Sequence, residues 1–466
     1  MSKIAKRVEM GERPPYQRIK DFDQVTLGFT PEQARAEARR CLQCKKPVCI
    51  DGCPVRIDIK GFVRAIAEGD IARAAKILYE KNNLPAICGR VCPQEEQCEL
   101  KCVLKKVGEP IAIGDLERFA ADWKMFNADN NQLSGEIPET NYRVAVVGSG
   151  PAGLTCAGDL AQLGVKVTVF ESLNEAGGVL RYGIPEFRLP GEILDYELKR
   201  LEKLGVKIEL NCLIGRTKTI SDLFAEGYQA VFLGTGAGLP KFLGIPGENF
   251  NHIYSANEFL VRVNLMHAFE FPEKSDTPIY IGRRVAVIGG GNTAMDAART
   301  ALRLGAGEVT LIYRRSEAEM PARQVEIIHA REEGIKFLFL TNPVEFLGNE
   351  KGFVRAIECV KMELTEPGAD GRRSVRPVSG SNFIVPVDMV IVAIGLSPNP
   401  VVPSLTPELK TDKEGHLLVD ENRQTSLEGV FAGGDITGGE TVIQAMGMGK
   451  LAAEKIYQYL KNKFPQ

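Results

Sequence analysis

The chain has 466 residues, 44% hydrophobic and 25% charged, which is typical of a soluble globular protein with about three domains. Its 58 Lys and Arg against 60 Asp and Glu give a formal net charge of -2, so no overall field favours nucleic acid or an anionic membrane. The first residues lack the apolar core of a signal peptide, and no run reaches the ~18 apolar residues of a membrane span, so we expect a cytoplasmic protein.

Residues 1 to about 130 are expected to form a small helical domain. The stretch Thr30–Gln33 predicts a helix start, because the threonine can cap, the proline suits the first helical position, and the glutamine completes a capping box. That helix is expected to run into Cys41. Apolar residues at helical spacing predict two further short helices, interrupted at Gly69-Asp70.

Eight of the eleven cysteines fall between residues 41 and 102, in two groups that read C-x2-C-x4-C-x3-C-P and C-x3-C-P-x4-C-x3-C. Clustered cysteines in a reducing compartment are more often metal ligands than disulfides. Zinc ribbons usually pair two C-x2-C knuckles, whereas four close thiols followed by proline favour iron–sulfur ligation. We therefore expect two 4Fe-4S clusters, with structural zinc as the alternative. The eight are Cys41, Cys44, Cys49, Cys53, Cys88, Cys92, Cys98 and Cys102.

Spacing alone would assign all eight thiols as ligands. In two-cluster ferredoxins the cysteine before the proline serves the other cluster, so Cys53 is assigned to the second cluster. The three remaining cysteines, Cys156, Cys212 and Cys359, are interpreted as small buried residues.

A polar, turn-rich stretch at 127–140 predicts a linker, after which the chain changes character. Residues 142–171 read as an apolar strand, a glycine turn, a helix and a second strand that ends in an acid. The glycines allow a tight turn, the approach of a pyrophosphate and helix–strand packing, and the acid is placed to bond a ribose hydroxyl. The residues expected to bind this first dinucleotide are Gly148, Gly150, Pro151, Ala152, Gly153 and Glu171.

A second copy of the pattern spans 283–315 and differs at the end of its second strand, where Tyr313-Arg314-Arg315 replaces the acid. An acid would repel a 2′-phosphate, whereas two guanidiniums can bind it through charge-assisted hydrogen bonds, so NADP is expected here. A solvated basic turn is the alternative. The residues expected to bind NADP are Gly289, Gly290, Gly291, Asn292, Thr293, Ala294, Arg314 and Arg315, with Arg323 either assisting or facing water.

Residues 429–435, GVFAGGD, and the following TVIQAMGMGKLAAEKIY predict a strand, a glycine turn and a helix. In two-dinucleotide flavoproteins such a returning segment places an aspartate at the ribityl chain and a helix N-terminus near the flavin ring, so the first dinucleotide is expected to be FAD. The strand ends at 231–237 and 390–400 are expected to be the crossings between the two nucleotide domains. The FAD candidates in the returning segment are Gly434, Asp435, Thr441 and Val442.

These elements predict an α/β fold with two Rossmann-like domains of the two-dinucleotide flavoprotein type, preceded by a small α-helical iron–sulfur domain. None of the four histidines stands at a metal or triad spacing, and hydride exchange between stacked cofactors needs no general base, so no catalytic side chain is assigned. The expected division is 1–130 for the cluster domain, 131–141 for the linker, 142–275 with 390–466 for the FAD domain, and 276–389 for an inserted NADP(H) domain.

Eight stretches, in order over nearly the whole chain, resemble the glutamate synthase small subunit family of FAD and NADPH oxidoreductases. They are CLQCKKPVCIDGCPV, CGRVCPQEEQCELKC, IAIGDLERF, GSGPAG, GGVLRYGIPEFRLP, GGGNTAMD, YRR and FAGGD. This family includes the large subunit of the electron-bifurcating NADH-dependent reduced ferredoxin:NADP oxidoreductase, and the N-terminal half of dihydropyrimidine dehydrogenase is similar to it.

The resemblance implies a different ligand set from spacing alone. It implies that Cys41, Cys44, Cys49 and Cys102 hold one cluster, and that Cys53, Cys92 and Cys98 hold the other together with Glu117. Cys88 would then be spare, and the sequence leaves Cys88 and Glu117 as alternatives, with an exposed helix acid as a third interpretation of Glu117. The resemblance also implies that Gly178, Val179 and Arg188 line the flavin, and that Ala393, Ile394 and Gly395 approach the nicotinamide nucleotide.

The combined prediction is an NADPH-dependent oxidoreductase subunit that exchanges hydride between NADP(H) and FAD and passes single electrons through two 4Fe-4S clusters. GCPVRIDIKGFVRAI and GGETVIQAMGMGKLAA look closer to the bifurcating type, which favours bifurcation between NADPH, ferredoxin and NAD with a small flavin and 2Fe-2S partner subunit. The alternative is the small subunit of NADPH-dependent glutamate synthase, which would feed electrons to a glutamate-forming large subunit. A non-catalytic scaffold is a third class, which bound flavin would exclude. Neither nucleic acid nor a membrane is expected as a partner.

Overall fold

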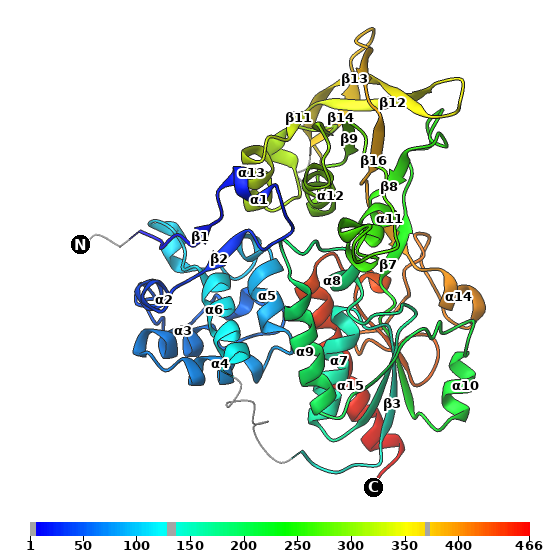
Figure 1. Ribbon diagram of the computed structural model, residues 1–466. Helices are drawn as coiled ribbons and strands as arrows, with labels where there is room; N and C mark the ends of the chain where they lie inside the picture. Colours follow the sequence, from blue (N-terminus) through cyan, green and yellow to red (C-terminus); the bar gives the residue numbers. More distant parts are fainter. Residues whose placement is uncertain (1–5, 128–136, 369–372) are drawn as a thin grey trace.

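The computed structural model describes residues 6–127, 137–368 and 373–466 and has three parts (Figure 1). A group of N-terminal helices lies beside a domain built on one parallel sheet, and a second sheet domain lies above both in this view. The expected linker at 131–141 falls partly outside the described residues, and its described part, 137–141, forms no helix or strand.

The first helix of the N-terminal part, α2 (Pro31–Ala38), begins as its sequence predicts. The Gln33 N–H donates to Thr30 Oγ1 at 3.2 Å, and the Thr30 N–H donates to Gln33 Oε1 at 2.9 Å, which completes the capping box. The helix ends at Ala38 and does not continue to Cys41. The first cysteine therefore lies on a loop, where its direction is set by the packing of the domain.

The expected interruption at Gly69 separates α3 (Ile59–Glu68) from α4 (Ile71–Tyr79). Gly69 takes a φ of 87°, a left-handed conformation that ends the first helix at little steric cost, and Asp70 caps the second. Both helices bury their apolar faces in the core of this part. The other elements here are β1 (Gly11–Glu12), α1 (Pro15–Arg18), β2 (Thr26–Gly28), α5 (Pro85–Val91) and α6 (Ile113–Phe126).

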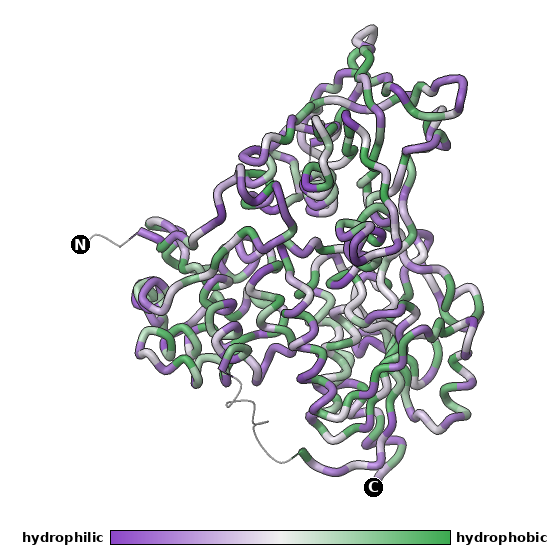
Figure 2. The backbone as a smooth tube through the Cα atoms, in the orientation of Figure 1, coloured by the Kyte–Doolittle hydropathy of each residue, from purple (hydrophilic) through white to green (hydrophobic). Residues whose placement is uncertain are grey.

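The first parallel sheet has the strand order β18-β6-β3-β4-β5. Its strands are β3 (Arg143–Val147), β4 (Lys166–Phe170), β5 (Lys207–Glu209), β6 (Ala230–Leu233) and β18 (Val430–Ala432). The central strands are buried and mostly green in Figure 2, as expected for parallel strands covered on both faces. The return of β18 to this sheet confirms the predicted C-terminal strand.

Helices α7 (Pro151–Gln162) and α15 (Val442–Lys463) pack against each other beside this sheet, and α9 (Gly191–Lys203) lies next to α7 (Figure 1). Their apolar residues share one core with the N-terminal helices. The cluster domain and the first sheet domain are therefore packed together. Two short helices, α8 (Val179–Tyr182) beside α9 and α10 (Ile220–Ala225) beside β6, also belong to this domain.

The second parallel sheet has the order β11-β10-β9-β16-β8. Its strands are β8 (Ile253–Ser255), β9 (Arg284–Ile288), β10 (Glu308–Ile312), β11 (Lys336–Leu338) and β16 (Met389–Val392). Its helices are α11 (Ala256–Leu260), α12 (Asn292–Arg303) and α13 (Gln324–Glu332).

The membership of β8 and β16 corrects the domain limits expected at 275/276 and 389/390. The chain crosses between the domains on β7 (Ala237–Pro240) and β17 (Leu396–Pro398), which pair antiparallel. The second domain therefore lies between these two strands. The expected limits were misplaced because strand pairing decides which sheet a segment joins, and the glycine fingerprint does not mark where the domain begins.

An antiparallel sheet that the sequence did not predict covers one face of the second domain. It consists of β12 (Thr341–Gly348), β13 (Val354–Pro367), β14 (Arg373–Pro377) and β15 (Phe383–Pro386). Alternate residues of β9 separate the two faces: Val285 and Val287 share a core with α12, whereas Ala286 and Ile288 share one with β12 and β13.

Buried charges attach the N-terminal segment to the second domain. Arg18 is 1% exposed, and its Nε donates to Glu333 Oε1 at 2.8 Å. Arg299 and Arg303 of α12 bind the same carboxylate at 2.8 and 2.7 Å. Burial by itself would raise the pKa of Glu333, but the hydrogen bonds and charges of Arg303 and Arg299 lower it to about 2.

Candidate functional site

The first glycine fingerprint forms the turn between β3 and α7. Gly148 has a φ of 97°, and a Cβ there would lie 2.5 Å from the Gly234 oxygen. A Cβ at Gly153 would lie 1.9 Å from the Gly148 oxygen, whereas one at Gly150 would meet nothing within 4 Å. Two glycines are thus required by the fold, and the third keeps a space open. No side chain caps α7, which leaves its first N–H groups available to an anion.

Two distant segments approach this turn as expected for an FAD cradle. A Cβ at Gly178, next to Val179, would lie 2.8 Å from the Gly150 Cα. A Cβ at Gly434 would lie 3.0 Å from the Ala152 Cβ. Thr441 caps α15, with its Oγ1 accepting from the Gln444 N–H. The returning segment and the GGV segment therefore meet at the fingerprint.

The acids of this cradle are buried. Glu171 is 4% exposed and accepts from the N–H groups of Ser149 and Leu173, each at 2.9 Å, so it holds the fingerprint turn against the end of β4. Its expected bond to a ribose stays a prediction. Burial, with Glu440 nearby, raises the pKa of Asp435 to about 6.

Two further residues of the cradle escaped the sequence analysis. Burial and then the charges of Asp435 and Glu171 raise the pKa of Tyr182 to about 12. The hydroxyl oxygen of Thr235, beside the Gly148 turn, is buried and has no hydrogen-bond partner within the described residues. An unpartnered polar atom in an open cradle fits a bound ligand that supplies the partner. No spacing rule identifies either residue.

Arg188, expected at the flavin, has another set of contacts in the structure. Its guanidinium binds both carboxylate oxygens of Asp296 at 2.9 and 2.7 Å and Glu326 at 3.0 Å. Both partners belong to the second domain, on α12 and α13. Arg188 thus links the two nucleotide domains, because a buried guanidinium needs carboxylates around it. Its role at the flavin stays a prediction.

The second glycine fingerprint opens a pocket between β9, β16 and α12. Gly289 takes a φ of 146°, and a Cβ there would lie 2.2 Å from the Ala393 oxygen. No side chain caps α12, and its first turn has no acid. Ala294 is buried in the helix packing, and the Asn292 side chain accepts from the Arg323 N–H. The expected residues that line the pocket are Gly289, Gly290, Gly291, Thr293, Arg314, Arg315, Ala393, Ile394 and Gly395.

The two arginines after β10 are suited to an anion. Within the described part of the chain, no carboxylate pairs with Arg314 or Arg315, although most buried arginines here have one. The Nε of Arg315 is buried without a hydrogen-bond partner. Both side chains line the pocket, so they fit the 2′-phosphate of NADP. Sequence analysis missed Tyr313, Asn257, Thr341 and Asn342, which also line it.

Arg323 does not line that pocket. Its guanidinium donates to Glu95 Oε1 at 3.1 Å and to Gln94 Oε1 at 2.8 Å, and both partners lie in the cluster domain. Neither interpretation made from the sequence, assistance at the phosphate or exposure to water, described this contact. Arg323 instead joins the second nucleotide domain to the loop that carries Cys92 and Cys98.

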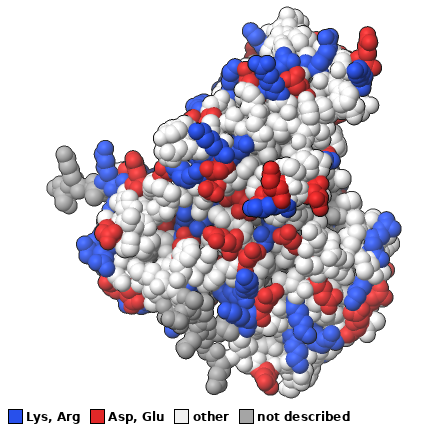
Figure 3. Space-filling view, viewed as in Figure 1, with Lys and Arg blue, Asp and Glu red and all other residues white. Residues whose placement is uncertain are grey.

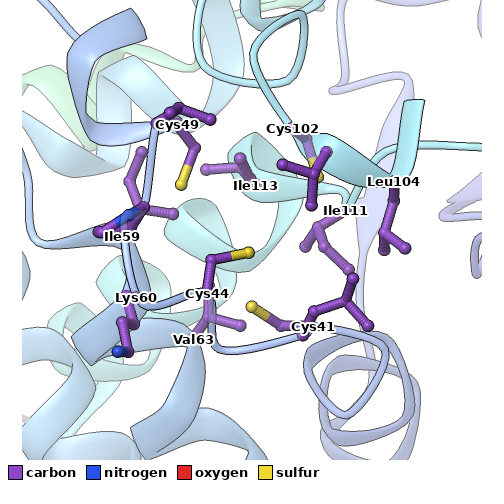
Figure 4. A pocket seen from close by; sticks show the side chains of 14 residues that line it. Cys41, Cys44, Cys49, Ile59, Lys60, Val63, Cys102, Leu104, Ile111 and Ile113 are labelled. Atoms are coloured by element: carbon purple, nitrogen blue, oxygen red, sulfur yellow. The ribbon is translucent and has the colours of Figure 1, made fainter. Parts of the chain in front are cut away.

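The first set of thiols converges on one pocket. Cys41, Cys44, Cys49 and Cys102 all line it, and Figure 4 shows their sulfurs around a common space. Ile59, Val63, Ile111 and Ile113 form apolar walls. The four cysteines are partly exposed, so this set reaches the surface of the protein. These are the four that the family resemblance grouped, and they come from two separate segments, 39–50 and 101–108.

The second set lies deeper and contains Cys53, Cys92 and Cys98. Burial raises the pKa of Cys53 to about 11, with added contributions from the charges of Glu117 and Cys88. For Cys98, burial and then the charges of Glu99 and Glu117 raise the pKa. For Cys92 the hydrogen bond with Cys88 contributes most, followed by burial. Thiols this close to one another and to a carboxylate can share one cationic centre, which would hold them as thiolates.

Glu117 on α6 is 5% exposed and belongs to this second set. Burial raises its pKa to about 8, although Asn82 Nδ2 donates to Oε1 at 2.8 Å. Among the described residues no Lys or Arg pairs with it. An unpaired buried carboxylate beside three thiols fits a ligand of a metal centre, because a cation would compensate its charge. The interpretation of Glu117 as an exposed helix acid was wrong.

Cys88 lies at the same centre on the side of the flavin domain. Its Sγ is fully buried, 3.4 Å from Met446 Sδ of α15 and 3.8 Å from Asn82 Oδ1. It also shares a hydrogen bond with Cys92. Geometry therefore keeps Cys88 close enough to remain the alternative to Glu117.

The distances between the thiols disfavour zinc. One zinc ion with Zn–S bonds near 2.3 Å keeps its sulfurs within about 4.6 Å of each other. Among the described residues, the only three or more Cys, His, Asp or Glu ligand atoms mutually within 4.8 Å belong to Asp412, Glu414 and His416 on an exposed turn. No three thiols are that close, which fits the larger span of an iron–sulfur cluster.

The remaining cysteines and histidines match their structural interpretation. Cys156, Cys212 and Cys359 are buried. His252 stacks on Tyr280, and His329 is buried beside Glu12. No histidine lines either of the two candidate pockets among the described residues.

Comparison with known families identifies an iron–sulfur part followed by a nucleotide-binding part. Residues 18–129 match the family described as dihydropyrimidine dehydrogenase domain II, 4Fe-4S cluster, and residues 142–449 match the pyridine nucleotide-disulphide oxidoreductases. The chain is 38% identical over 462 residues to the glutamate synthase [NADPH] small chain of Halomonas elongata, covering 97% of this chain and 96% of that one. The Escherichia coli K12 small chain is also 38% identical over 462 residues, covering 98% and 97%.

The chain belongs to the glutamate synthase small-chain family. It is an NADPH-dependent flavin and iron–sulfur oxidoreductase. The same sequence pattern occurs in longer relatives, such as the NADP(+)-dependent formate dehydrogenase subunit beta of Moorella thermoacetica, 39% identical over 89% of this chain and 60% of that one.

Solved structures support the same fold. FprA of Mycobacterium tuberculosis, solved in complex with NADPH, superposes with a TM-score of 0.59 at 22% identity, over 69% of this chain and 85% of that one. Thioredoxin reductase of T. acidophilum gives 0.51 at 21% identity, over 68% and 97%. Both confirm the two-dinucleotide architecture. Within the described residues, none of the helices has both the length and the apolar character to cross a membrane.

The open space at Gly150 gives a direct test of the FAD cradle. The backbone of Gly150 suits any residue and its surroundings are empty, so Gly150→Ala should fold but place a methyl group where the ligand must approach. We expect FAD binding to weaken by about 1–3 kcal/mol, measured as bound flavin per chain and by flavin titration. Gly108→Ala, also in open space, is the matched control. Unchanged flavin affinity in Gly150→Ala would place the cofactor elsewhere.

Proposed function

We propose that this chain is the NADP(H)-handling subunit of a larger oxidoreductase and joins a nicotinamide to one-electron centres. The proposal rests on one observation: two dinucleotide cradles and two thiol sets are packed into one chain, with α15 touching both the FAD cradle and the second thiol set. When bound, FAD would exchange one hydride, which carries an electron pair, with the nicotinamide, and the clusters would pass these electrons on singly.

The residues we assign follow the geometry above. The first thiol set, Cys41, Cys44, Cys49 and Cys102, would hold one 4Fe-4S cluster, and Cys53, Cys92, Cys98 and Glu117 a second, with Cys88 as the alternative to Glu117. The fingerprint at Gly148–Gly153, Gly178 and Val179, and the segment from Gly434 to Val442 would hold FAD. The second pocket, with Arg314 and Arg315, would hold NADP(H).

The chain's own residues act by binding and positioning. The uncapped N-termini of α7 and α12 would donate N–H groups to the pyrophosphates of the two dinucleotides. Arg314 and Arg315 would select the 2′-phosphate of NADP(H). Arg188 and Arg323 hold the second domain against its neighbours, which fixes the approach of the nicotinamide to the flavin. No side chain needs to move a proton.

The similarity to glutamate synthase small chains makes the glutamate-forming large subunit the partner we favour. This replaces bifurcation, with ferredoxin and a small flavin and 2Fe-2S subunit, as the leading proposal, because the relatives that match nearly the whole chain at 38% identity are glutamate synthase small chains. Only the two stretches near Cys53 and Thr441 still support it. The names of beta subunits of a formate dehydrogenase and an NADPH-Fe(3+) oxidoreductase support a second redox subunit in general.

Anaerobic isolation of the tagged chain from the cells that make it tests the choice of partner. We expect a large subunit to co-purify and the complex to form glutamate from glutamine and 2-oxoglutarate with NADPH. Recovery of a small flavin and 2Fe-2S subunit, with NADPH oxidation coupled to both NAD and ferredoxin, would reverse the preference.

The assignment of NADP has its own test. Arg314→Gln with Arg315→Gln should weaken NADPH binding by about 1–3 kcal/mol per lost charge-assisted contact, while NADH binding stays the same. Binding can be followed by equilibrium dialysis of the flavin-loaded protein. Arg376→Gln on β14, which removes an exposed arginine, serves as control. Equal losses for NADPH and NADH would contradict the proposed contact.

Single substitutions separate Glu117 from Cys88. If Glu117 is the ligand, Glu117→Ala should lower iron from about eight to about four atoms per chain, as one of two 4Fe-4S clusters is lost, and Cys88→Ala should not. Glu96→Ala, which removes an exposed acid between Cys92 and Cys98, should leave iron unchanged. Loss of iron only in Cys88→Ala would transfer the assignment to the cysteine.

A further inference from the structure

Basic residues follow the cysteines of the first thiol set closely along the chain. The stretches 39–50 and 101–108, which carry its four cysteines, contain no Asp or Glu, although the whole chain has a formal net charge of -2. Lys60 also lines the thiol pocket, at its edge below Ile59 in Figure 4. We define the basic rim as Arg39, Lys45, Lys46, Lys60, Lys101, Lys105 and Lys106.

The charges of the basic rim are not neutralised within the chain. All members except Lys60 are exposed, and none has a carboxylate partner among the described residues. Nearby arginines outside the rim behave differently, since Arg56 pairs with Asp51 and Arg64 with Glu68. On the face shown in Figure 3 the two signs are interspersed. The rim is thus a group of unpaired charges of one sign, in a chain with 58 Lys and Arg against 60 Asp and Glu.

Apolar side chains occupy the centre of the rim. Leu42 and Val48 line the thiol pocket and are 59% and 39% exposed, and Val107 beside the pocket is 67% exposed. Exposed apolar residues inside a charged border are typical of a protein–protein contact with a polar rim. Their position at the thiols suggests that the contact serves electron exchange.

The different burial of the two thiol sets indicates which of them exchanges electrons with a partner. The second set is buried and touches α15 through Cys88 and Met446, whereas the first set is partly exposed. An electron that passes between the flavin domain and another protein would therefore enter or leave this chain at the first thiol set. A centre that must meet a partner repeatedly gains from electrostatic steering.

We propose that the basic rim is the docking surface for an acidic one-electron partner, a protein or subunit with carboxylates around its redox centre. This inference rests on the proposed function and names the partner chemistry of its exit site. In the direction of NADPH oxidation the balance is NADPH plus two oxidised carriers giving NADP+, a proton and two reduced carriers. The lysines attract the carboxylates, and Leu42 and Val48 form the dry centre of the contact.

Two forms of one electron carrier can test the sign of this surface. Native cytochrome c is basic, and succinylated cytochrome c has the same haem with its lysines converted to carboxylates. Anaerobically prepared holoprotein with NADPH should reduce the succinylated form faster, and the advantage should shrink as salt rises. The variant Lys45→Glu, Lys46→Glu, Lys105→Glu, Lys106→Glu should slow the succinylated form about tenfold or more and reverse the preference.

A variant elsewhere on the surface controls for added acids; it is compared with the pair Lys45→Glu, Lys46→Glu, which changes the charge by the same amount. Lys410→Glu with Lys413→Glu changes exposed lysines far along the chain from the rim and should leave the preference as in the wild type. Reduction of bound flavin by NADPH, followed by absorbance, should be unchanged in every variant. If flavin reduction fails in the wild type, the proposed function is wrong; if it succeeds while both cytochromes react alike, only the docking proposal is wrong.

The iron content of each variant shows whether a slower reaction results from loss of a cluster. If the quadruple Glu variant loses iron, Lys45→Gln with Lys46→Gln removes charge without adding acids, and it should still lower the rate with succinylated cytochrome c severalfold. An iron-replete variant with unchanged rates for both carriers overturns the proposal. So does a wild type that prefers native cytochrome c at low salt.

Discussion

The close packing of the C-terminal helix α15 is the contact on which the arrangement of the centres depends. A Cβ at Gly449 would lie 2.2 Å from the backbone oxygen of Ala152 in the FAD fingerprint, and one at Gly447 would lie 3.0 Å from Pro54, next to Cys53. Met446, one residue before Gly447, touches Cys88. Two glycines thus let one helix contact the flavin cradle and the buried thiol set together. A larger residue at either position would push the two domains apart.

The second nucleotide domain is attached differently, through charge. Arg188 reaches it from the first domain, Arg18 from the N-terminal segment, and Arg323 reaches back to the cluster domain. Each guanidinium has defined carboxylate partners, so these contacts specify one orientation, whereas an apolar interface can slide. In the proposed function, the apolar contact would fix the path between flavin and clusters, and the charged contacts would fix where the nicotinamide enters. Apolar packing suits a permanent route for electrons, and charged contacts suit a domain that must admit a ligand.

Local rules in the sequence predicted local structure well. The capping box at Thr30, the break at Gly69 and both glycine fingerprints depend on residues within one turn of each other, and each is found where expected. The grouping of Cys102 with the first thiols needed the family resemblance, because spacing places it with the second group. The structure agrees with the resemblance.

The features that sequence missed depend on long-range contacts. Arg188 and Arg323 were assigned to cofactors, yet their partners lie more than a hundred positions away, and no periodicity encodes such a pair. The antiparallel sheet β12–β15 and the place of β8 follow from strand pairing, which a linear pattern does not specify. Glu117 and Cys88 remain close alternatives because both side chains reach the same thiols.

The central claim is that electrons from NADPH reach iron–sulfur centres inside this one chain. Anaerobic titration of the purified holoprotein with NADPH, followed by electron paramagnetic resonance, tests it most directly. The account predicts that signals of reduced 4Fe-4S clusters grow as NADPH is added, without any partner subunit. Flavin that bleaches while no cluster signal appears, or zinc in place of iron and sulfide, would contradict it.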